Sequence, residues 1–262
     1  MQKQRRAVSA TTGNPNSRQT REMVEINLMR HYPRTQRKLT RPRALDPINA
    51  AAALRFGREY FDGSREQGYG GYRYDGRWIP IALDIVEHFG LKAGQRVLDV
   101  GCAKGFLVKD LMDVCPGLEV FGLDISEYAI TNCVPEAKGR LVLGSADALP
   151  FGSGSFAAVV SINTLHNLER SRLITALQET ERLSPGRSYV QVDAYHNDAE
   201  RDFFLGWCLT AKTFLKPADW RALFAEAGYH GDYHWTVLEM DPSVNDFGAS
   251  GAGPNNNQAE RE

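Results

Sequence analysis

The chain has 262 residues, of which 42% are apolar and 24% are charged, and its formal net charge is −1. This length and composition suffice for one substantial α/β core with extensions. No apolar run approaches the length that spans a bilayer, and no signal-peptide apolar region follows the N-terminus. The four cysteines show neither a metal-ligand spacing nor a disulfide framework. We therefore expect a reduced, cytoplasmic setting, no membrane insertion and no metal.

Charge is concentrated near the N-terminus, because residues 1–45 contain eleven Lys or Arg and two acids and so carry +9. Residues 1–20 are polar and basic, and we expect a disordered tail there. A solvated tail accounts for this charge, whereas nucleic-acid contact or an organellar address are the alternatives. Residues 243–262 are rich in glycine and asparagine, which predicts a second disordered tail.

The region 21–78 is expected to be a helical extension, with helices near residues 18–31 and 46–60. Its stretch 68–78 combines glycines with aromatic and arginine side chains, which can hold a planar ring or a cation and can clamp an anionic group. A glycine-rich turn packed on the core is the alternative. The candidate substrate-binding residues are Tyr69, Tyr72, Tyr74, Arg77 and Trp78.

A helix is predicted from Ile79 to its stop at Gly90, and it leads into the most informative segment of the chain, residues 97–107. There an apolar run containing Asp99 is followed by a loop with Gly101 and Gly105, and then by helical apolar spacing. This order predicts a buried parallel strand, a tight loop and a helix, in which a ligand can approach bare backbone.

A dinucleotide fingerprint would need two more glycines, at the positions that Ala103 and Phe106 occupy, so the spacing excludes it. The next predicted strand, residues 118–124, ends in Asp124. A carboxylate there can accept hydrogen bonds from both hydroxyls of a ribose, or it can cap the following helix near residues 127–132.

Asp147 lies in the segment 144–151, just before the predicted strand 156–161. An aspartate before Pro150 fits an ordinary turn, and its carboxylate can also accept a hydrogen bond from an amino group of a ligand. Further on, helices are predicted over residues 170–184 and 217–228. Strands are predicted over 187–193 and 233–239, and a seventh strand could come from residues 209–215.

These motifs, in this order, resemble the class I S-adenosylmethionine-dependent methyltransferases with a methyltransferase type 11-like domain, from about residue 80 to about residue 240. Ala103 departs from the family's Gly-x-Gly-x-Gly loop. The resemblance implies S-adenosylmethionine as the cofactor. It also implies an α/β, Rossmann-like, doubly wound, mostly parallel sheet of six or seven strands, the last antiparallel. This sheet would lie in a domain over residues 79–242, with the extra N-terminal helices of residues 21–78 as a substrate lid.

The resemblance also implies roles for individual residues. Asp99 either holds the loop or reaches the methionine amine of the cofactor through water. His166 follows the fourth strand, where small-molecule O-methyltransferases place a base, and histidine titrates near neutral pH. Relatives that carry a histidine there without assigned chemistry leave a structural role open, and Tyr195 and His196 are further candidates. The implied cofactor contacts are Asp99, Gly101, Gly105, Asp124 and Asp147.

The motifs of adenine, glutamine and cytosine methylation are absent, as are the acidic metal ligands of cation-dependent O-methyltransferases. These absences leave transfer to oxygen, nitrogen or carbon of a small molecule, and we expect an oxygen or nitrogen of a small-molecule acceptor rather than a nucleic acid. One alternative is an RNA or protein methyltransferase guided by the basic N-terminus. The other is a non-catalytic, S-adenosylmethionine-binding partner subunit.

Overall fold

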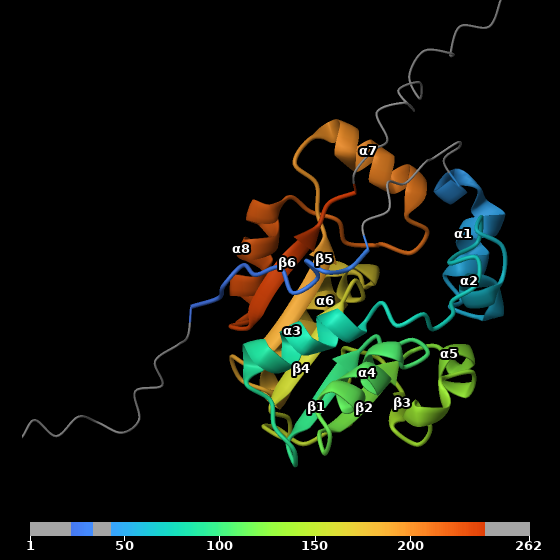
Figure 1. The fold of residues 1–262 in the computed structure, drawn as a ribbon. Helices are drawn as coiled ribbons and strands as arrows, with labels where there is room; N and C mark the ends of the chain where they lie inside the picture. The colour runs from blue at the N-terminus through green and yellow to red at the C-terminus, as the bar shows by residue number, and fades with distance from the viewer. Residues whose placement is uncertain (1–21, 34–42, 239–262) are drawn as a thin grey trace, which may run out of the picture.

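A computed structural model describes residues 22–33 and 43–238, so the tails expected at 1–20 and 243–262 lie outside the described residues. Six strands form one sheet in the order β3-β2-β1-β4-β5-β6 (Figure 1). All neighbouring pairs among these strands are parallel. The strands are β1 Arg96–Val100, β2 Glu119–Asp124, β3 Leu141–Leu143, β4 Ala158–Ile162, β5 Ser188–Asp193 and β6 Asp232–Thr236.

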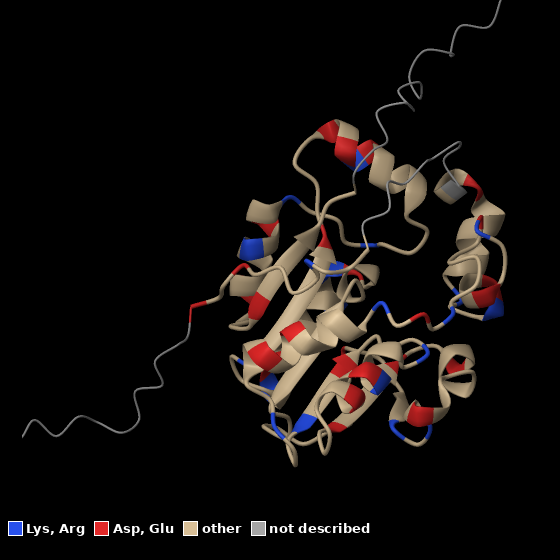
Figure 2. Cartoon of the chain, in the orientation of Figure 1, with Lys and Arg blue, Asp and Glu red and all other residues tan. Residues whose placement is uncertain are grey.

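Helices cover both faces of this sheet, as expected for a doubly wound fold. One core packs α3 and α4 against the sheet, and the other packs α6 and α8 against its opposite face. Most charged residues lie on the outer helices and loops, and the strands are largely uncharged (Figure 2). The helices are α1 Pro47–Ala53, α2 Arg58–Asp62, α3 Ile79–Phe89, α4 Phe106–Val114, α5 Glu127–Thr131, α6 Arg170–Leu183, α7 Asp198–Trp207 and α8 Pro217–Ala227, with single turns η1 Arg43–Leu45, η2 Pro135–Ala137 and η3 Leu165–Asn167.

The strand order reverses between β1 and β4, which are neighbours in the sheet although β2 and β3 intervene in the chain. In open parallel sheets a ligand binds outside the carboxyl ends of the strands at such a point. The helices α1, α2 and α7 do not cover the sheet faces and lie instead near one end of the strands (Figure 1). The strand order alone therefore predicts that a ligand binds at the carboxyl ends of β1 and β4.

The expectation of an antiparallel last strand is wrong for the described part of the chain. The last strand there, β6, pairs in parallel with β5 from Tyr189↔Asp232 to Asp193↔Thr236. Its outer edge is covered by the N-terminal segment, because Glu25 forms a parallel bridge with Tyr233. The candidate seventh strand at residues 209–215 forms only one isolated bridge.

The predicted N-terminal helices are only partly formed. Residues 22–33 contain an isolated bridge and a turn instead of the expected helix, because their partners are distant in sequence. Arg30 and His31 both contact the buried carboxylate of Asp84 on α3. The helix expected over 46–60 is split into α1 and α2, since the backbone turns at Phe56, where φ is +48°.

We predict that Asp232→Ala lowers the free energy of unfolding by about 3 kcal/mol, because buried hydrogen-bonding groups lose their partner. Asp232 is fully buried, accepts the Val24 N–H at 3.2 Å and lies 2.7 Å from His88 Nε2. Urea unfolding measures the loss. Asp202→Ala, at an acid whose side chain is 73% exposed, is the control and should change stability by less than about 0.5 kcal/mol. Equal stability of the two variants would contradict the prediction.

Candidate functional site

The loop after β1 needs glycine at two positions for different spatial reasons. Gly101 has φ +85°, and a Cβ there would lie 2.0 Å from Thr164 Oγ1. Gly105 has φ +76° at the start of α4, and a Cβ would lie 2.7 Å from the Ala137 Cβ. Ala103 also has a positive φ, +48°, which costs a non-glycine residue about 1 kcal/mol. The loop therefore keeps a left-handed backbone even where the family's middle glycine is replaced.

Asp124 joins the loops that follow β1 and β2. Its Oδ2 accepts the Ala103 N–H at 2.7 Å, and its Oδ1 accepts the Ser126 N–H at 2.8 Å. Burial raises the pKa of Asp124, and these backbone N–H groups oppose that rise. The N-cap of α5 is Ser126, whose hydroxyl accepts the Ala129 N–H. A carboxylate offers about four lone-pair sites, so Asp124 keeps acceptor capacity for a ligand.

Asp99 is a buried carboxyl group that lines the cavity described below. Burial, and then the nearby charge of Asp124, raise the pKa of Asp99 to about 8. No Lys, Arg or His of the described residues forms an ion pair with it. A buried carboxylate facing a cavity without a cationic partner fits the ammonium group of a ligand such as the methionine part of S-adenosylmethionine.

Asp147 is turned toward α6 rather than into the cavity. Its Oδ2 accepts a hydrogen bond from Arg172 Nε at 2.6 Å, and Ser145 donates to its other oxygen. The Arg172 guanidinium holds the pKa of Asp147 at about 2, well below its usual range. The Arg172 side chain is 49% exposed, so it is free to move toward solvent if Asp147 takes another partner.

One cavity of about 610 Å³ joins the loop after β1 to the carboxyl ends of β4, β5 and β6. It brings together the predicted cofactor residues Asp99 and Gly101, the predicted base His166, and three of the five predicted substrate residues. Gly105, Asp124 and Asp147 lie outside its lining. The three substrate candidates on the wall are Tyr69, Tyr72 and Trp78.

Tyr74 and Arg77, the other two substrate candidates, are engaged outside the cavity. The Tyr74 hydroxyl donates to Asp110 Oδ1 at 2.6 Å. Arg77 forms an ion pair with Asp75 and donates to the Tyr32 hydroxyl at 3.2 Å. The aromatic and arginine side chains of the stretch 68–78 thus have different partners, which its composition did not reveal.

His166 is buried on η3 with both ring nitrogens near Asp193. The Asp193 N–H donates to Nδ1 at 3.3 Å, so the ring proton lies on Nε2, which is 3.3 Å from Asp193 Oδ2. Burial lowers the pKa of His166, against the opposing charge of Asp193, and keeps the imidazole neutral. Proton acceptance at Nδ1 therefore requires only that the long Asp193 N–H bond be released.

A hydrogen-bond chain across the cavity floor was not anticipated from the sequence. The Tyr189 hydroxyl donates to Gln191, the Gln191 amide to Thr236, and the Thr236 hydroxyl to Asn163 Oδ1 at 3.0 Å. Every donor points the same way, so the Asn163 amide NH₂ is the donor end of the chain. Asn163 also has φ +51°, which asparagine tolerates better than most residues. Only the polar residues at the strand ends could have signalled this chain.

Across residues 22–33 and 43–238, no group of three or more His, Cys, Asp or Glu side chains could hold a metal ion. In the same residues, no helix is long and apolar enough to cross a membrane.

Part of the chain is similar in sequence to known methyltransferases. Residues 97–186 match the family model of a methyltransferase domain. The chain is 33% identical over 114 residues to an uncharacterized methyltransferase of Synechocystis sp., covering 42% of this chain and 52% of that protein. It is 31% identical over 148 residues to the demethylmenaquinone methyltransferase of Beutenbergia cavernae, covering 55% and 57%. The chain thus spans about half the length of these relatives.

Solved structures with a similar chain trace were also found. The putative methyltransferase in complex with the Haloferax volcanii Trm112 activator has a TM-score of 0.48 at 21% identity, covering 73% of this chain and 77% of that chain. The YcgJ protein of Bacillus subtilis has a TM-score of 0.46 at 19% identity, covering 56% and 66%. From the match over residues 97–186 and the methyltransferase relatives, this part of the chain is a methyltransferase domain, and it resembles those of the class I S-adenosylmethionine-dependent methyltransferases.

Proposed function

We propose that this chain transfers the methyl group of S-adenosylmethionine to an oxygen or nitrogen atom of a small-molecule acceptor. The observation that carries the proposal is a cavity of about 610 Å³ whose lining contains Asp99 and Gly101, His166, and the aromatic side chains of Tyr69, Tyr72 and Trp78. Cavities of roughly 300–1,000 Å³ suit small ligands. A cofactor against Asp99 and Gly101 and an acceptor beside His166 would therefore share one cavity.

For the cofactor, each candidate residue has a distinct task. The backbone at Gly101 allows close approach of the ligand, Asp99 pairs with its ammonium group, and Asp124 accepts ribose hydroxyls with its remaining lone pairs. Asp147 reaches an adenine amino group once Arg172 releases it. When bound, S-adenosylmethionine supplies a methyl carbon made electrophilic by the sulfonium.

For the acceptor, the chain's own residues provide alignment and a proton acceptor. An in-line displacement gains much of its rate from holding the nucleophile on the axis of the bond that breaks. Tyr69, Tyr72 and Trp78 provide aromatic surfaces for this, and the Asn163 amide provides a donor. Neutral His166 takes the proton that the acceptor loses, and the carboxylate of Asp193 stabilises the imidazolium that forms.

The names of several relatives support a small acceptor. They include demethylmenaquinone methyltransferases and a sterol 24-C-methyltransferase of Gibberella zeae. A relative named as a tRNA methyltransferase, from Xenopus tropicalis, is 30% identical over 115 residues, which are 18% of that protein. Together with the +9 charge of residues 1–45, it supports RNA as the alternative acceptor.

The proposal predicts that label from S-adenosylmethionine enters the small-molecule fraction of a cell extract and that S-adenosylhomocysteine forms in parallel. Mass spectrometry of the labelled fraction identifies the product. Label in the RNA fraction that is lost when residues 1–45 are deleted would instead establish the RNA alternative. Cofactor binding without any labelled product would favour a non-catalytic partner subunit.

The pKa of Asp99 predicts a pH dependence of cofactor binding. Because burial raises this pKa to about 8, the free protein holds the carboxyl protonated near pH 6 and must lose that proton to pair with an ammonium. The affinity for S-adenosylhomocysteine should therefore rise between pH 6 and pH 7.5, by up to about tenfold per pH unit. The ligand's own α-amine lies beside a carboxylate, so it is more basic than a peptide's α-amino group, whose pKa is about 7.7–8.0, and it stays protonated over this range.

Calorimetry in two buffers of different ionisation enthalpy measures the proton released on binding, and Asp99→Asn should abolish both the release and the pH dependence. In the free protein the same shift makes the free energy of unfolding fall as the pH rises from about 4 to about 8, because the folded chain holds the proton more tightly than the unfolded chain. A wild-type affinity that is flat below pH 7.5 would refute the assignment of Asp99.

Asp124→Ala should weaken binding of S-adenosylhomocysteine by about 1–3 kcal/mol, because charge-assisted bonds to the ribose are lost along with the anchors of two loops. Calorimetry gives the affinity, and circular dichroism checks that the variant is folded. Asp113→Ala, at a half-exposed acid on α4, is the control and should bind as the wild type does. Unchanged affinity in folded Asp124→Ala protein would rule out ribose contact by Asp124.

A further inference from the structure

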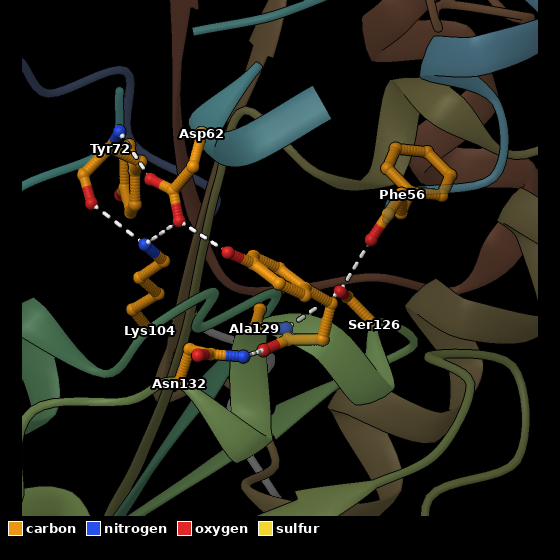
Figure 3. Close-up of polar contacts among 8 residues, drawn as sticks. Phe56, Asp62, Tyr72, Lys104, Ser126, Ala129 and Asn132 are labelled. Atoms are coloured by element: carbon orange, nitrogen blue, oxygen red, sulfur yellow. Dashed lines mark hydrogen bonds and ion pairs between the residues drawn. The ribbon is translucent and has the colours of Figure 1, made fainter. Parts of the chain in front are cut away.

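Four residues connect the N-terminal helical segment, residues 43–78, to the loops that follow β1 and β2. We call this segment the cap. We call the four residues the cap clamp: Asp62 at the end of α2, Tyr72, Lys104 in the loop after β1, and Tyr128 on α5. Lys104 Nζ lies 2.6 Å from Asp62 Oδ2 and donates to the Tyr72 carbonyl at 3.1 Å (Figure 3). The Tyr128 hydroxyl donates to the same Asp62 oxygen at 2.7 Å. The clamp thus spans residues more than sixty positions apart.

The clamp holds the backbone of Tyr72 from both sides. Its N–H donates to Asp62 Oδ1 at 3.1 Å, while its carbonyl accepts from Lys104. With the backbone fixed, the Tyr72 ring stacks on Phe106, at 4.7 Å between ring centroids and 10° between planes. Tyr72 also lines the cavity. The position of a cavity wall therefore depends on an ion pair outside the cavity.

The other end of the clamp is Lys104, which lies in the loop after β1. We call this loop the cofactor loop, because the proposed function places the cofactor there. Lys104 lies between Ala103, whose N–H is bound by Asp124, and Gly105, where α4 begins. A second tie runs in parallel, since the Ser126 hydroxyl donates to the Phe56 carbonyl at 2.5 Å (Figure 3). Any shift of the cofactor loop must therefore move Lys104 and, through Asp62, the backbone of Tyr72.

The charges of the clamp are strongly paired. The Lys104 side chain is 10% exposed and that of Asp62 is 26% exposed. Burial raises the pKa of Asp62, but the bonds from Lys104, Tyr128 and the Tyr72 N–H outweigh it and lower this pKa overall. Hydrogen bonds between ionised partners are stronger than neutral ones, and removing one partner leaves the other charge uncompensated. A displacement of Lys104 is therefore transmitted to Asp62 and to the backbone of Tyr72.

We propose that Lys104 and Asp62 are positioning residues that couple the cofactor loop to the acceptor-facing wall at Tyr72. This inference rests on the proposed function, because it takes the loop after β1 as the cofactor site and the cavity beyond Tyr72 as the acceptor site. Cofactor binding orders the loop, Lys104 carries that order to Asp62 and Tyr72, and the acceptor then meets a fixed wall. By linkage, an acceptor tightens cofactor binding by the same factor.

Amide hydrogen exchange of the full chain, with and without S-adenosylhomocysteine, tests the coupling. In the wild type, ligand binding should slow exchange over residues 58–74 by about tenfold or more. Lys104→Met and Asp62→Asn should remove most of this protection at ligand concentrations that calorimetry shows to be saturating for each variant. Lys104→Arg should restore it, and Lys212→Met, which removes a surface pair with Glu169 at 3.7 Å, should leave it intact.

Protection that persists in Lys104→Met, or a wild type whose residues 58–74 do not respond to bound ligand, would overturn the coupling. Without ligand, exchange at the Tyr72 amide should be about tenfold faster in Asp62→Asn than in the wild type, because its buried acceptor is weakened. If the wild type bound no S-adenosylhomocysteine, the proposed function would fail and the coupling with it. The ligand-free exchange rate of Tyr72 would still decide whether the clamp holds this residue.

Discussion

The structure depends on one buried carboxylate that binds backbone N–H groups from two loops. Asp124 accepts from Ala103 after β1 and from Ser126 after β2, so one carboxylate fixes the relative positions of these two loops. Burying this group is costly, and the two N–H bonds offset part of the cost. The cofactor loop is consequently held at Ala103 before a ligand binds, which leaves less of the loop for binding to order.

Elements that local sequence patterns determine were predicted from the sequence, whereas elements that depend on residues far along the chain were not. The strands β1 and β2 and the stop of α3 at Gly90, where φ is +59°, follow from local patterns and were predicted closely. The segment 22–33 was predicted wrongly because Asp84 and Asp232, far along the chain, determine its path. The antiparallel last strand was expected from family resemblance alone, and Glu25 covers the edge of β6 instead.

The candidate site, too, was predicted only where local motifs determine it. Motif spacing identified Asp99, Gly101 and His166, and the structure brings all three to one cavity, although their roles stay predictions. Residue type alone could not show that Arg172 binds Asp147. Partner choice among long polar side chains is decided by packing between elements distant in sequence, and no local pattern encodes it. The cap clamp was missed for this reason, since Asp62 and Lys104 have no motif in common.

A reaction driven by alignment explains why charged groups would be buried in the cap at all. An in-line displacement loses rate when donor and acceptor shift by a fraction of a bond length, so their two sites must be held rigidly to each other. Apolar packing alone lets surfaces slide, whereas directional bonds at Asp62 and Asp124 fix distances and angles. The path from Asp124 through Ala103 and Lys104 to Asp62 and Tyr72 consists of such bonds and one short loop. Under the proposed function, the cap is the part of the site that sets the geometry of transfer, and this geometry accounts for the charged groups that the cap buries.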